Sequence, residues 1–298
     1  MSAQIISGTD VARAIRDEVA EKTRAVAQGR GRVPGLATVL VGDDPASQAY
    51  VRMKNRDAEE VGFRSRQIDL VDSTSEDELL GWVEGLNADP NVDGILVQLP
   101  LTPQINEARI LSAIDPAKDV DGFNPVNVGR LSAGDPNVLA PCTPSGIVEL
   151  LVRGGHDPAG RHVVIIGRSN IVGKPMASLL LGRGRGGNAT VTVAHSRTPN
   201  LAEVTRAAEI LIVAIGQPEM VTAEMVRPGA VVIDVGVNRV DDDSNERGYR
   251  LIGDVEFDGV EKVASAITPV PGGVGPMTRA MLLSNTLTAY LASEDPEA

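Results

Sequence analysis

The sequence is poor in aromatic residues and in cysteine, and both shortages narrow the classes of function open to it. Only 2% of the 298 residues are aromatic, and the formal net charge is −12. A chain with neither a basic field for phosphates nor rings on which bases could stack is not expected to bind nucleic acid. The single cysteine, Cys142, excludes an internal disulfide. With three histidines and no H-x-x-x-H or C-x-x-C spacing, we expect no protein-bound metal.

Long apolar runs are also missing. No stretch of about 18 apolar residues occurs, and residues 1–8 lack the charged and apolar regions of a signal peptide. We therefore expect no membrane partner and a cytoplasmic location. With 42% apolar residues, a chain of this length is expected to form about two domains, each with its own buried core.

The first part of the chain alternates between amphipathic and continuously apolar stretches, which predicts an α/β domain. A capping box, Ser75-x-x-Glu78, marks the start of one helix. The motif Pro141-Cys-Thr-Pro144 marks the domain boundary, with Thr143 as the cap and Pro144 as the first residue of the next helix. Further helices are expected over 10–27, 46–61 and 107–114, and strands over 36–41, 67–71 and 94–99.

After the boundary, apolar strands recur at intervals of about 20 to 28 residues, with helical stretches between several of them. This spacing of strands and helices is typical of a doubly wound parallel sheet, the Rossmann-type fold. The predicted domains are residues 1–143 and 144–275. We expect strands over 162–167, 190–194, 210–215 and 231–235, and a last helix over 277–291.

The first strand of the second domain leads into a glycine-bracketed turn and then into a helix. In the turn, Gly167-Arg-Ser-Asn-Ile-Val-Gly173, the residues Gly167, Ser169 and Gly173 would let the backbone turn sharply and approach a ligand. The helix N-terminus would then face a pyrophosphate. The spacing G-x-S-x-x-x-G differs from the usual G-x-G-x-x-G, so an ordinary tight turn is the alternative. The position after the first strand of a parallel sheet favours a dinucleotide site.

The second strand of this domain ends in His195-Ser-Arg-Thr198. An NAD site carries a carboxylate here for the ribose 2′-hydroxyl, whereas an NADP site must attract a phosphate. Because the carboxylate is missing and Arg197 is present, the sequence favours NADP, and Arg168 would supply a second positive charge. The alternative is that both arginines are solvated surface residues.

Polar residues in the first domain could converge on one crevice opposite the nucleotide domain. Tyr50 and Lys54 lie four residues apart on a predicted helix, and Gln98 ends a buried strand, where open α/β sheets bind ligands. Asp119 and Asp121 follow in the next loop. Taken singly, the lysine and tyrosine would be ordinary surface residues, and the aspartates would serve in turns or caps.

Short motifs between residues 50 and 278 stand in a fixed order along the chain. They are Tyr50-Val-Arg-Met-Lys54, Gly94-Ile-Leu-Val-Gln-Leu-Pro-Leu101, Lys118-Asp-Val-Asp-Gly-Phe-Asn124, Pro141-Cys-Thr-Pro144, Gly167-Arg-Ser-Asn-Ile-Val-Gly173, His195-Ser-Arg-Thr198 and Pro271-Gly-Gly-Val-Gly-Pro-Met-Thr278. This series resembles the signatures of the methylenetetrahydrofolate dehydrogenase/methenyltetrahydrofolate cyclohydrolase family. The one mild departure is Val237, where isoleucine is commoner in the family.

The resemblance implies a fold, a partner and a set of site residues. It implies an N-terminal folate domain, a Rossmann-type NADP domain, a C-terminal helix (276–298) that returns to the first domain, and a homodimer. Folate would lie in the interdomain cleft and NADP on the second domain. The implied folate and catalytic residues are Tyr50, Lys54, Gln98, Asp121, Pro271, Gly272 and Gly273, and the implied cofactor residues are Gly167, Arg168, Ser169, Ile171, Gly173, Ser196, Arg197, Val237 and Thr278.

The implied activity has two steps and belongs to one-carbon metabolism, which serves purine and amino-acid biosynthesis. Hydride transfer from 5,10-methylenetetrahydrofolate to NADP gives a methenyl cation, which water converts to 10-formyltetrahydrofolate. Lys54, with a pKa lowered by burial, would move the protons, and Gln98 would hold it in place. The carboxylate of Asp121 suits the paired donors of a pterin edge.

Two other classes of protein are weighed against this one. A dehydrogenase of the same two-domain shape could act on another substrate, as shikimate-type enzymes do, but Asp121 and the Pro271-Gly-Gly273 turn argue against it. A regulatory nucleotide-binding protein could have kept only the Rossmann half. The presence of Lys54, Gln98 and Asp121 together argues against that alternative.

Overall fold

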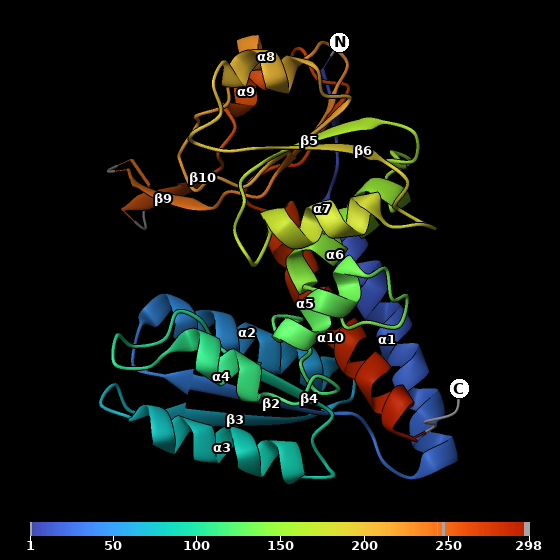
Figure 1. The fold of residues 1–298 in the computed structure, drawn as a ribbon, viewed down its shortest axis with the longest axis vertical. Coiled ribbons are helices and arrows are strands. Elements are labelled where there is room, and N and C mark those ends of the chain that lie inside the picture. The colour runs from blue at the N-terminus through green and yellow to red at the C-terminus, as the bar shows by residue number, and fades with distance from the viewer. Residues whose placement is uncertain (1, 243, 246–247, 295–298) are drawn as a thin grey trace. The chain divides into compact units, whose positions relative to one another are not determined.

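The structure, a computed structural model, describes residues 2–242, 244–245 and 248–294 (Figure 1). It confirms an α/β fold with parallel sheets. Two compact units divide the chain. The six-strand unit comprises residues 1–12 and Thr143–Thr278, and the three-strand unit comprises Arg13–Cys142 and the residues from Arg279 onward.

These units differ from the predicted domain boundaries at the N-terminus. The prediction places residues 1–143 together, whereas the first twelve residues belong to the six-strand unit. The reason is a short strand that the sequence pattern does not reveal: β1 (Gln4–Ile5) pairs in parallel with β11 (Ala266–Ile267). Of the predicted returning helix, residues 295–298 lie outside the described part of the chain.

The three-strand unit is built on parallel strands in the order β3-β2-β4. Alternate residues of β2, Ala37, Val39 and Val41, pack against Leu79 and Val83 of α3. On the opposite face, the Thr38 hydroxyl donates to the Asn55 side chain of α2 at 3.0 Å. Helices therefore cover both faces of the sheet. Its elements are β2 (Gly35–Val41), α2 (Pro45–Glu60), β3 (Arg64–Leu70), α3 (Glu76–Ala88), β4 (Gly94–Val97), α4 (Glu107–Ala113) and α5 (Pro125–Ser132). It also contains α1 (Gly8–Arg30) from Arg13 onward and α10 (Val274–Glu294) from Arg279 onward.

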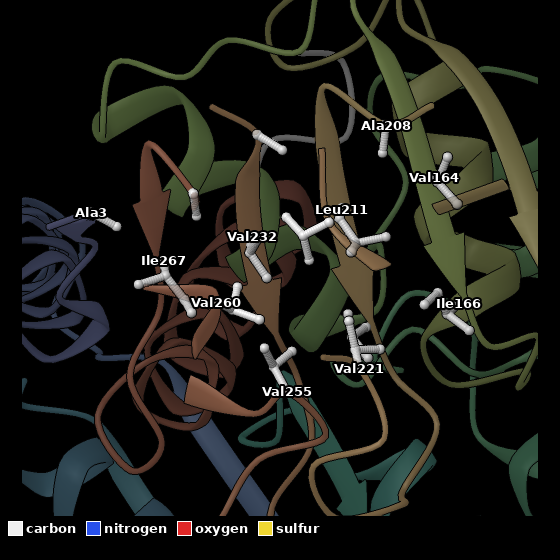
Figure 2. Packing of buried hydrophobic residues seen from close by; sticks show 14 of the residues in the cluster. Ala3, Val164, Ile166, Ala208, Leu211, Val221, Val232, Val255, Val260 and Ile267 are labelled. Atoms are coloured by element: carbon white, nitrogen blue, oxygen red, sulfur yellow. The ribbon is translucent and has the colours of Figure 1, made fainter. Parts of the chain in front are cut away.

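The main sheet of the six-strand unit has the strand order β1-β11-β8-β7-β5-β6, and its neighbouring strands pair in parallel. Figure 2 shows its core, in which Val164 and Ile166 of β5, Leu211 of β7 and Val232 of β8 pack with Ile267 of β11. Its elements are α6 (Cys142–Arg153), β5 (His162–Ile166), α7 (Gly173–Leu181), β6 (Thr190–Ala194), α8 (Leu201–Arg206), β7 (Ile210–Val213), η1 (Ala223–Met225), β8 (Val231–Asp234), β9 (Asn238–Asp241), β10 (Tyr249–Ile252) and α9 (Phe257–Val260).

Most predicted helices and strands are present, with bounds shifted by a few residues. The predicted cap at Thr143 is wrong, because α6 begins at Cys142 and the Thr143 hydroxyl pairs with that of Thr278 at 2.9 Å. The strand expected over 94–99 ends at Val97, where the Gln98 side chain turns back to donate to the Leu99 carbonyl. The antiparallel pair β9–β10 was not predicted, since both strands are short and half-exposed.

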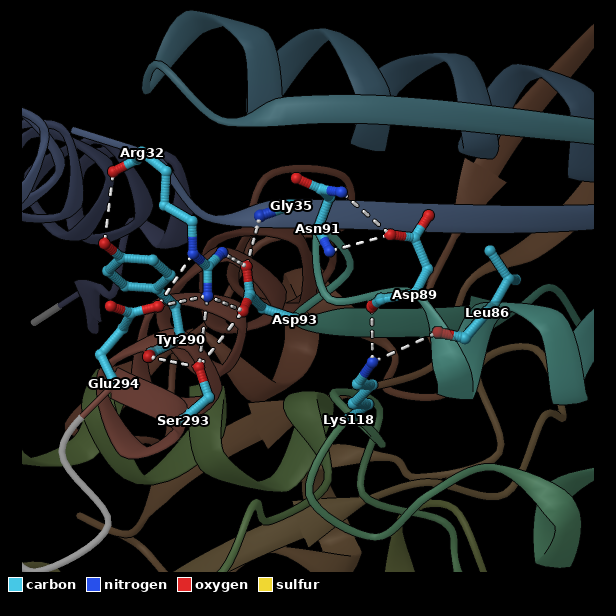
Figure 3. Close-up of polar contacts among 10 residues, drawn as sticks. All are labelled: Arg32, Gly35, Leu86, Asp89, Asn91, Asp93, Lys118, Tyr290, Ser293 and Glu294. Carbon is cyan, nitrogen blue, oxygen red and sulfur yellow. Dashed lines mark hydrogen bonds and ion pairs between the residues drawn. The ribbon is translucent and has the colours of Figure 1, made fainter. Parts of the chain in front are cut away.

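A cluster around Arg32 attaches the end of α10 to the sheet of the three-strand unit (Figure 3). The guanidinium donates two hydrogen bonds to Asp93, at 2.8 and 3.0 Å, and one to Glu294 at 2.9 Å. It also lies 4.4 Å from the ring centroid of Tyr290. Asp93 in turn accepts the backbone N–H of Gly35 at the start of β2. Charge, stacking and backbone hydrogen bonding thus hold the C-terminal helix in one position.

Candidate active site

Lys54 is a buried lysine at the centre of the polar cluster in the three-strand unit. Asp44 caps α2 by accepting the N–H of Ser47 at 2.7 Å, and this fixes the first turn of the helix. One turn separates Tyr50 from Lys54, and the Lys54 ammonium lies 4.7 Å from the Tyr50 ring centroid. Only 4% of Lys54 is exposed. Such a position is rare for lysine unless a partner accepts its hydrogen bonds.

Gln98 supplies that partner from the carboxyl end of β4. Its side-chain oxygen accepts a hydrogen bond from the Lys54 Nζ at 3.1 Å, and its side-chain amide donates to the Leu99 carbonyl at 2.6 Å. The backbone N–H of Gln98 donates to Val39 of the neighbouring strand β2. Both ends of the glutamine side chain are therefore fixed, and its oxygen is directed at the lysine.

Burial lowers the pKa of Lys54, and the nearby charge of Asp121 opposes this shift. A lysine with a lowered pKa is neutral in a larger fraction of molecules near pH 7, so it can accept a proton. Burial also raises the pKa of the Cys142 thiol well above its ordinary value, and the thiol donates to the Val120 carbonyl at 3.2 Å. Cys142 is therefore a structural thiol and not a nucleophile.

The loop that carries Asp121 is shaped by Asp119, which is only 1% exposed. One Asp119 carboxylate oxygen accepts the backbone N–H groups of Gly122 and Phe123 at 3.2 and 3.3 Å. The other accepts the N–H of Asn124 at 2.8 Å and the side-chain amide of Asn127 at 3.0 Å. Asp119 thus performs the turn role considered for it from the sequence, while Asp121 stays half-buried beside Lys54.

The loop is also held from α10 by a residue that the sequence analysis missed. The side-chain amide of Asn285 donates to the carbonyls of Val120 and Ala140, at 2.8 and 2.9 Å. Gly122 has a φ of +73°, and a Cβ there would lie 2.5 Å from the backbone nitrogen of Pro141. An asparagine among the mostly apolar buried residues of α10 was the available signal, but its partners lie more than 140 residues earlier in the chain.

In the six-strand unit, the glycine turn between β5 and α7 packs closely against neighbouring backbone. Gly167 has a φ of +128°, and a Cβ on it would lie 2.2 Å from the Ala214 carbonyl oxygen. A Cβ on Gly173 would lie 2.2 Å from the Gly167 carbonyl oxygen. The Ser169 hydroxyl accepts the N–H of Val172 at 3.1 Å. Glycine is required at both ends, and the turn leads directly into a helix N-terminus suited to a phosphate.

The turn after β6 lies beside the glycine turn. The N–H of Gly167 donates to the Ala194 carbonyl, and β5 pairs with β6 up to this residue. Ser196 and Arg197 follow Ala194 and are exposed, as is Arg168. The turn itself is ordered by the Thr198 hydroxyl, which accepts the backbone N–H of His195 at 2.9 Å. Both arginine side chains are therefore accessible from solvent.

The remaining predicted residues of the six-strand unit lie at other points of the unit. Ile171 is 47% exposed and Val237 is 58% exposed. The Pro271–Gly273 turn packs on the start of α1, where the N–H of Thr9 donates to the Gly272 carbonyl at 3.1 Å. Thr278 pairs with Thr143. Tyr50, Lys54, Gln98 and Asp121 instead belong to the three-strand unit.

Two buried carboxylates of the six-strand unit, Asp234 and Asp254, were also missed by the sequence analysis. Asp234 closes the apolar strand β8, which is the same signal that singled out Gln98 at the end of β4. Within the described part of the chain, no group of three or more His, Cys, Asp and Glu side chains could hold a metal ion. No helix among these residues is long and apolar enough to cross a membrane.

Comparisons with known proteins match both halves of the chain to domains of one family. Residues 6–121 match the family described as tetrahydrofolate dehydrogenase/cyclohydrolase, catalytic domain, and residues 141–294 match its NAD(P)-binding domain. The bifunctional protein FolD of Salinibacter ruber is 56% identical over 287 residues, which are 96% of this chain and 95% of that protein. FolD of Prosthecochloris aestuarii is 53% identical over 98% of this chain and 99% of its own length.

A solved structure is similar over the whole fold. The methylenetetrahydrofolate dehydrogenase-cyclohydrolase of Trypanosoma brucei, solved with NADP cofactor and an inhibitor, superposes with a TM-score of 0.93 at 44% identity. The match covers 99% of both chains.

Proposed function

The chain belongs to the tetrahydrofolate dehydrogenase/cyclohydrolase family, and from this premise we propose which of its residues carry out the family's two reactions. It is a bifunctional enzyme that oxidises 5,10-methylenetetrahydrofolate with NADP and hydrolyses the product to 10-formyltetrahydrofolate. The observation that carries the assignment of roles is the buried Lys54 ammonium, held by Gln98 and stacked on Tyr50.

In the proposed folate site, Tyr50 supports the ring, and Asp121 accepts the paired N–H donors of the pterin edge. Pro271, Gly272 and Gly273 contribute a further turn to this site. Asp119 supports the assignment of Asp121, because it holds the backbone of the same loop through buried hydrogen bonds. Residues 1–143 with the returning helix are the proposed folate domain, and residues 144–275 are the proposed NADP domain.

In the proposed cofactor site, the glycine turn and the turn after β6 hold NADP. The close packing at Gly167 and Gly173 fits a dinucleotide, because the backbone can approach a pyrophosphate without a side chain in between. The exposed Arg168 and Arg197, with Ser196, suit the 2′-phosphate. NADP, when bound, accepts the hydride. The wider set of proposed cofactor residues adds Ser169, Ile171, Val237 and Thr278.

In the dehydrogenase step, the protein orients the methylene bridge of the folate and excludes water while a hydride leaves it. In the cyclohydrolase step, water attacks the methenyl carbon, and neutral Lys54 takes a proton from the adduct. As the formyl C=O forms, the remaining hydroxyl proton passes to the ring nitrogen and the bond between the carbon and that nitrogen breaks. The products are 10-formyltetrahydrofolate and the one proton that Lys54 took and then releases. Gln98 keeps the Lys54 nitrogen in place through its 3.1 Å hydrogen bond.

We extend the proposal to the setting of the enzyme, which rests on its family membership. The protein is a cytoplasmic homodimer that supplies one-carbon units for purine and amino-acid biosynthesis. Light scattering coupled to gel filtration tests the dimer, and a mass of 31.3 kDa, that of one chain, would contradict it.

The test of the catalytic proposal is a paired assay on the wild-type enzyme and on Lys54→Met. NADPH formation at 340 nm measures the dehydrogenase, and the loss of methenyltetrahydrofolate absorbance without nucleotide measures the cyclohydrolase. Proton transfer by a positioned group contributes about 10²–10⁴-fold, so Lys54→Met should lose at least about 100-fold of the hydrolysis rate. Binding of folate and NADP should largely persist.

The matched control is Lys22→Met, which changes an exposed lysine of α1 in the same unit. It should leave both activities unchanged. Unchanged hydrolysis in Lys54→Met would refute the role of Lys54. Absence of both activities from the wild-type enzyme would refute the function itself.

A further inference from the structure

Asp234 is a buried carboxylate at the carboxyl end of β8, and it ties two segments of the six-strand unit together. One of its oxygens accepts the backbone N–H groups of Gly236 and Asp254, both at 3.0 Å. The other accepts the N–H of Val255 at 3.0 Å. The segment after β8 and the segment after β10 are therefore held by one side chain.

Asp254 does the same for two further segments. One of its oxygens accepts the N–H groups of Ile215 and Gly216, just after β7, at 2.7 and 2.8 Å. The other accepts the side-chain amide of Asn238 at 2.8 Å. Neither carboxylate is more than 3% exposed. Together they receive donors from the segments that follow β7, β8 and β10.

The two carboxylates require glycine at two neighbouring positions. A Cβ on Gly236 would lie 2.3 Å from an oxygen of Asp254, and a Cβ on Gly253 would lie 1.8 Å from an oxygen of Asp234. Two buried carboxylates cost free energy that apolar packing would not. Stability alone therefore does not explain why two carboxylates, and not apolar side chains, occupy these buried positions.

Val237 lies between the two anchored points. On one side the N–H of Gly236 is held by Asp234, and on the other the side chain of Asn238 is held by Asp254. Val237 itself is 58% exposed, although it is apolar. The carboxyl ends of β7 and β8 are where a parallel sheet of this type binds its ligand. The carboxylates thus present an apolar side chain and a fixed backbone at the ligand-binding edge.

We propose that Asp234 and Asp254 are positioning residues that hold Val237 and the segment after β7 against the nicotinamide half of NADP. This inference rests on the proposed cofactor site. The pair acts on the nicotinamide half alone, since the adenosine half is assigned to the turns after β5 and β6.

The test compares two ligands by calorimetry: NADP, and adenosine 2′,5′-bisphosphate, which lacks the nicotinamide half. Asp254→Leu removes the acceptor of the Ile215 and Gly216 N–H groups, whereas Asp254→Asn keeps one oxygen for them. Asp254→Leu should weaken NADP binding about 10-fold and leave the bisphosphate unchanged. It should also lower the dehydrogenase kcat by about 10- to 100-fold, because misplacement by about 1 Å can cost this much. Asp254→Asn should restore most of both losses.

The nucleotide-free cyclohydrolase rate is the internal control, because it depends on Lys54 in the other unit, and it should not change. Equal weakening of both ligands, or no change in either, would overturn the inference. If Asp254→Leu does not fold by circular dichroism, Asp234→Asn replaces it, with an expected smaller loss of NADP affinity in the same direction. A wild-type protein that binds neither ligand would refute the proposed cofactor site itself.

Discussion

Replacing Asp119 should destabilise the loop that carries Asp121. In Asp119→Ala the loop loses an acceptor for four hydrogen bonds. Gly122 keeps a second acceptor, the Asp119 carbonyl at 3.1 Å, and Phe123 is half-buried, so water can reach it. The buried donors of Asn124 and Asn127 account for most of the loss.

The expected loss in the free energy of unfolding follows from the two buried donors, those of Asn124 and Asn127. A buried donor left without an acceptor costs about 1–3 kcal/mol, so two cost about 4 kcal/mol. Burial raises the pKa of Asp119, so removal of this poorly solvated carboxylate offsets part of the cost. We expect Asp119→Ala to lower the free energy of unfolding by about 3 kcal/mol, or the midpoint temperature by about 6–12 °C. Asp119→Asn keeps one oxygen for Asn124 and should cost about 1 kcal/mol.

Urea unfolding followed by circular dichroism measures these values, and steady-state kinetics measures the functional effect. Both variants should raise the KM for methylenetetrahydrofolate more than the KM for NADP, because Asp121 lies two residues further along the same loop. A change of less than about 1 kcal/mol in Asp119→Ala would show that water solvates the loop donors, and would refute the reasoning.

Three further predictions follow from the charges. Arg197→Ala should raise the KM for NADP at least about 10-fold and change the KM for NAD little, because only NADP carries the 2′-phosphate. Equal changes in the two KM values in steady-state assays would contradict the assignment of Arg197. Arg32→Leu leaves the buried Asp93 without its cation and should cost about 2–3 kcal/mol in thermal unfolding, whereas Arg32→Lys keeps the charge and should lose less. Equal losses in the two variants would show that a positive charge beside Asp93 does not by itself stabilise the fold. Burial raises the pKa of Asp234 from 3.8 to about 6, so the folded protein binds this proton more tightly than the unfolded chain. The stabilisation that results from this proton is complete below about pH 4, and about 3 kcal/mol of it is lost as the pH rises through 6. Urea unfolding of the wild-type protein and of Asp234→Asn over this pH range measures the effect. A difference between the two proteins that does not change with pH would refute the prediction.

The sequence predicted the parts of the fold that depend on local pattern. Apolar runs of four to seven residues gave β2, β4, β5, β7 and β8, and the capping box at Ser75 marks α3, where its hydroxyl accepts the N–H of Glu78 at 3.2 Å. The glycine turn was predictable because Gly167 and Gly173 are required by backbone contacts within the same turn and its neighbouring strand.

Features that depend on distant partners were not predictable in this way. The strand β1 is only two residues long, and its partner β11 is about 260 residues away. Asn285 is unusual as an asparagine among the buried residues of α10, but its partners could not be predicted, because the carbonyls it binds lie more than 140 residues earlier. Asp234 carried a signal, a carboxylate ending an apolar strand, but its partner Asp254 could not be read from spacing. The sequence shows which residues are of an unexpected type for their position, and the structure shows which of them are in contact.

The division of the chain into units has a consequence for the order in which the protein can form during its synthesis. The three-strand unit is nearly complete at Cys142, yet α10, which carries Asn285 and the contacts to Arg32, belongs to it only from Arg279 onward. At about 5–20 residues per second, the ribosome delivers that helix on the order of ten seconds after the rest of the unit. The loop with Asp121 therefore gains its last fixed contacts only after α10 has been synthesised. A message truncated before α10 would yield a chain whose folate loop lacks this support, even though every residue of the loop is present.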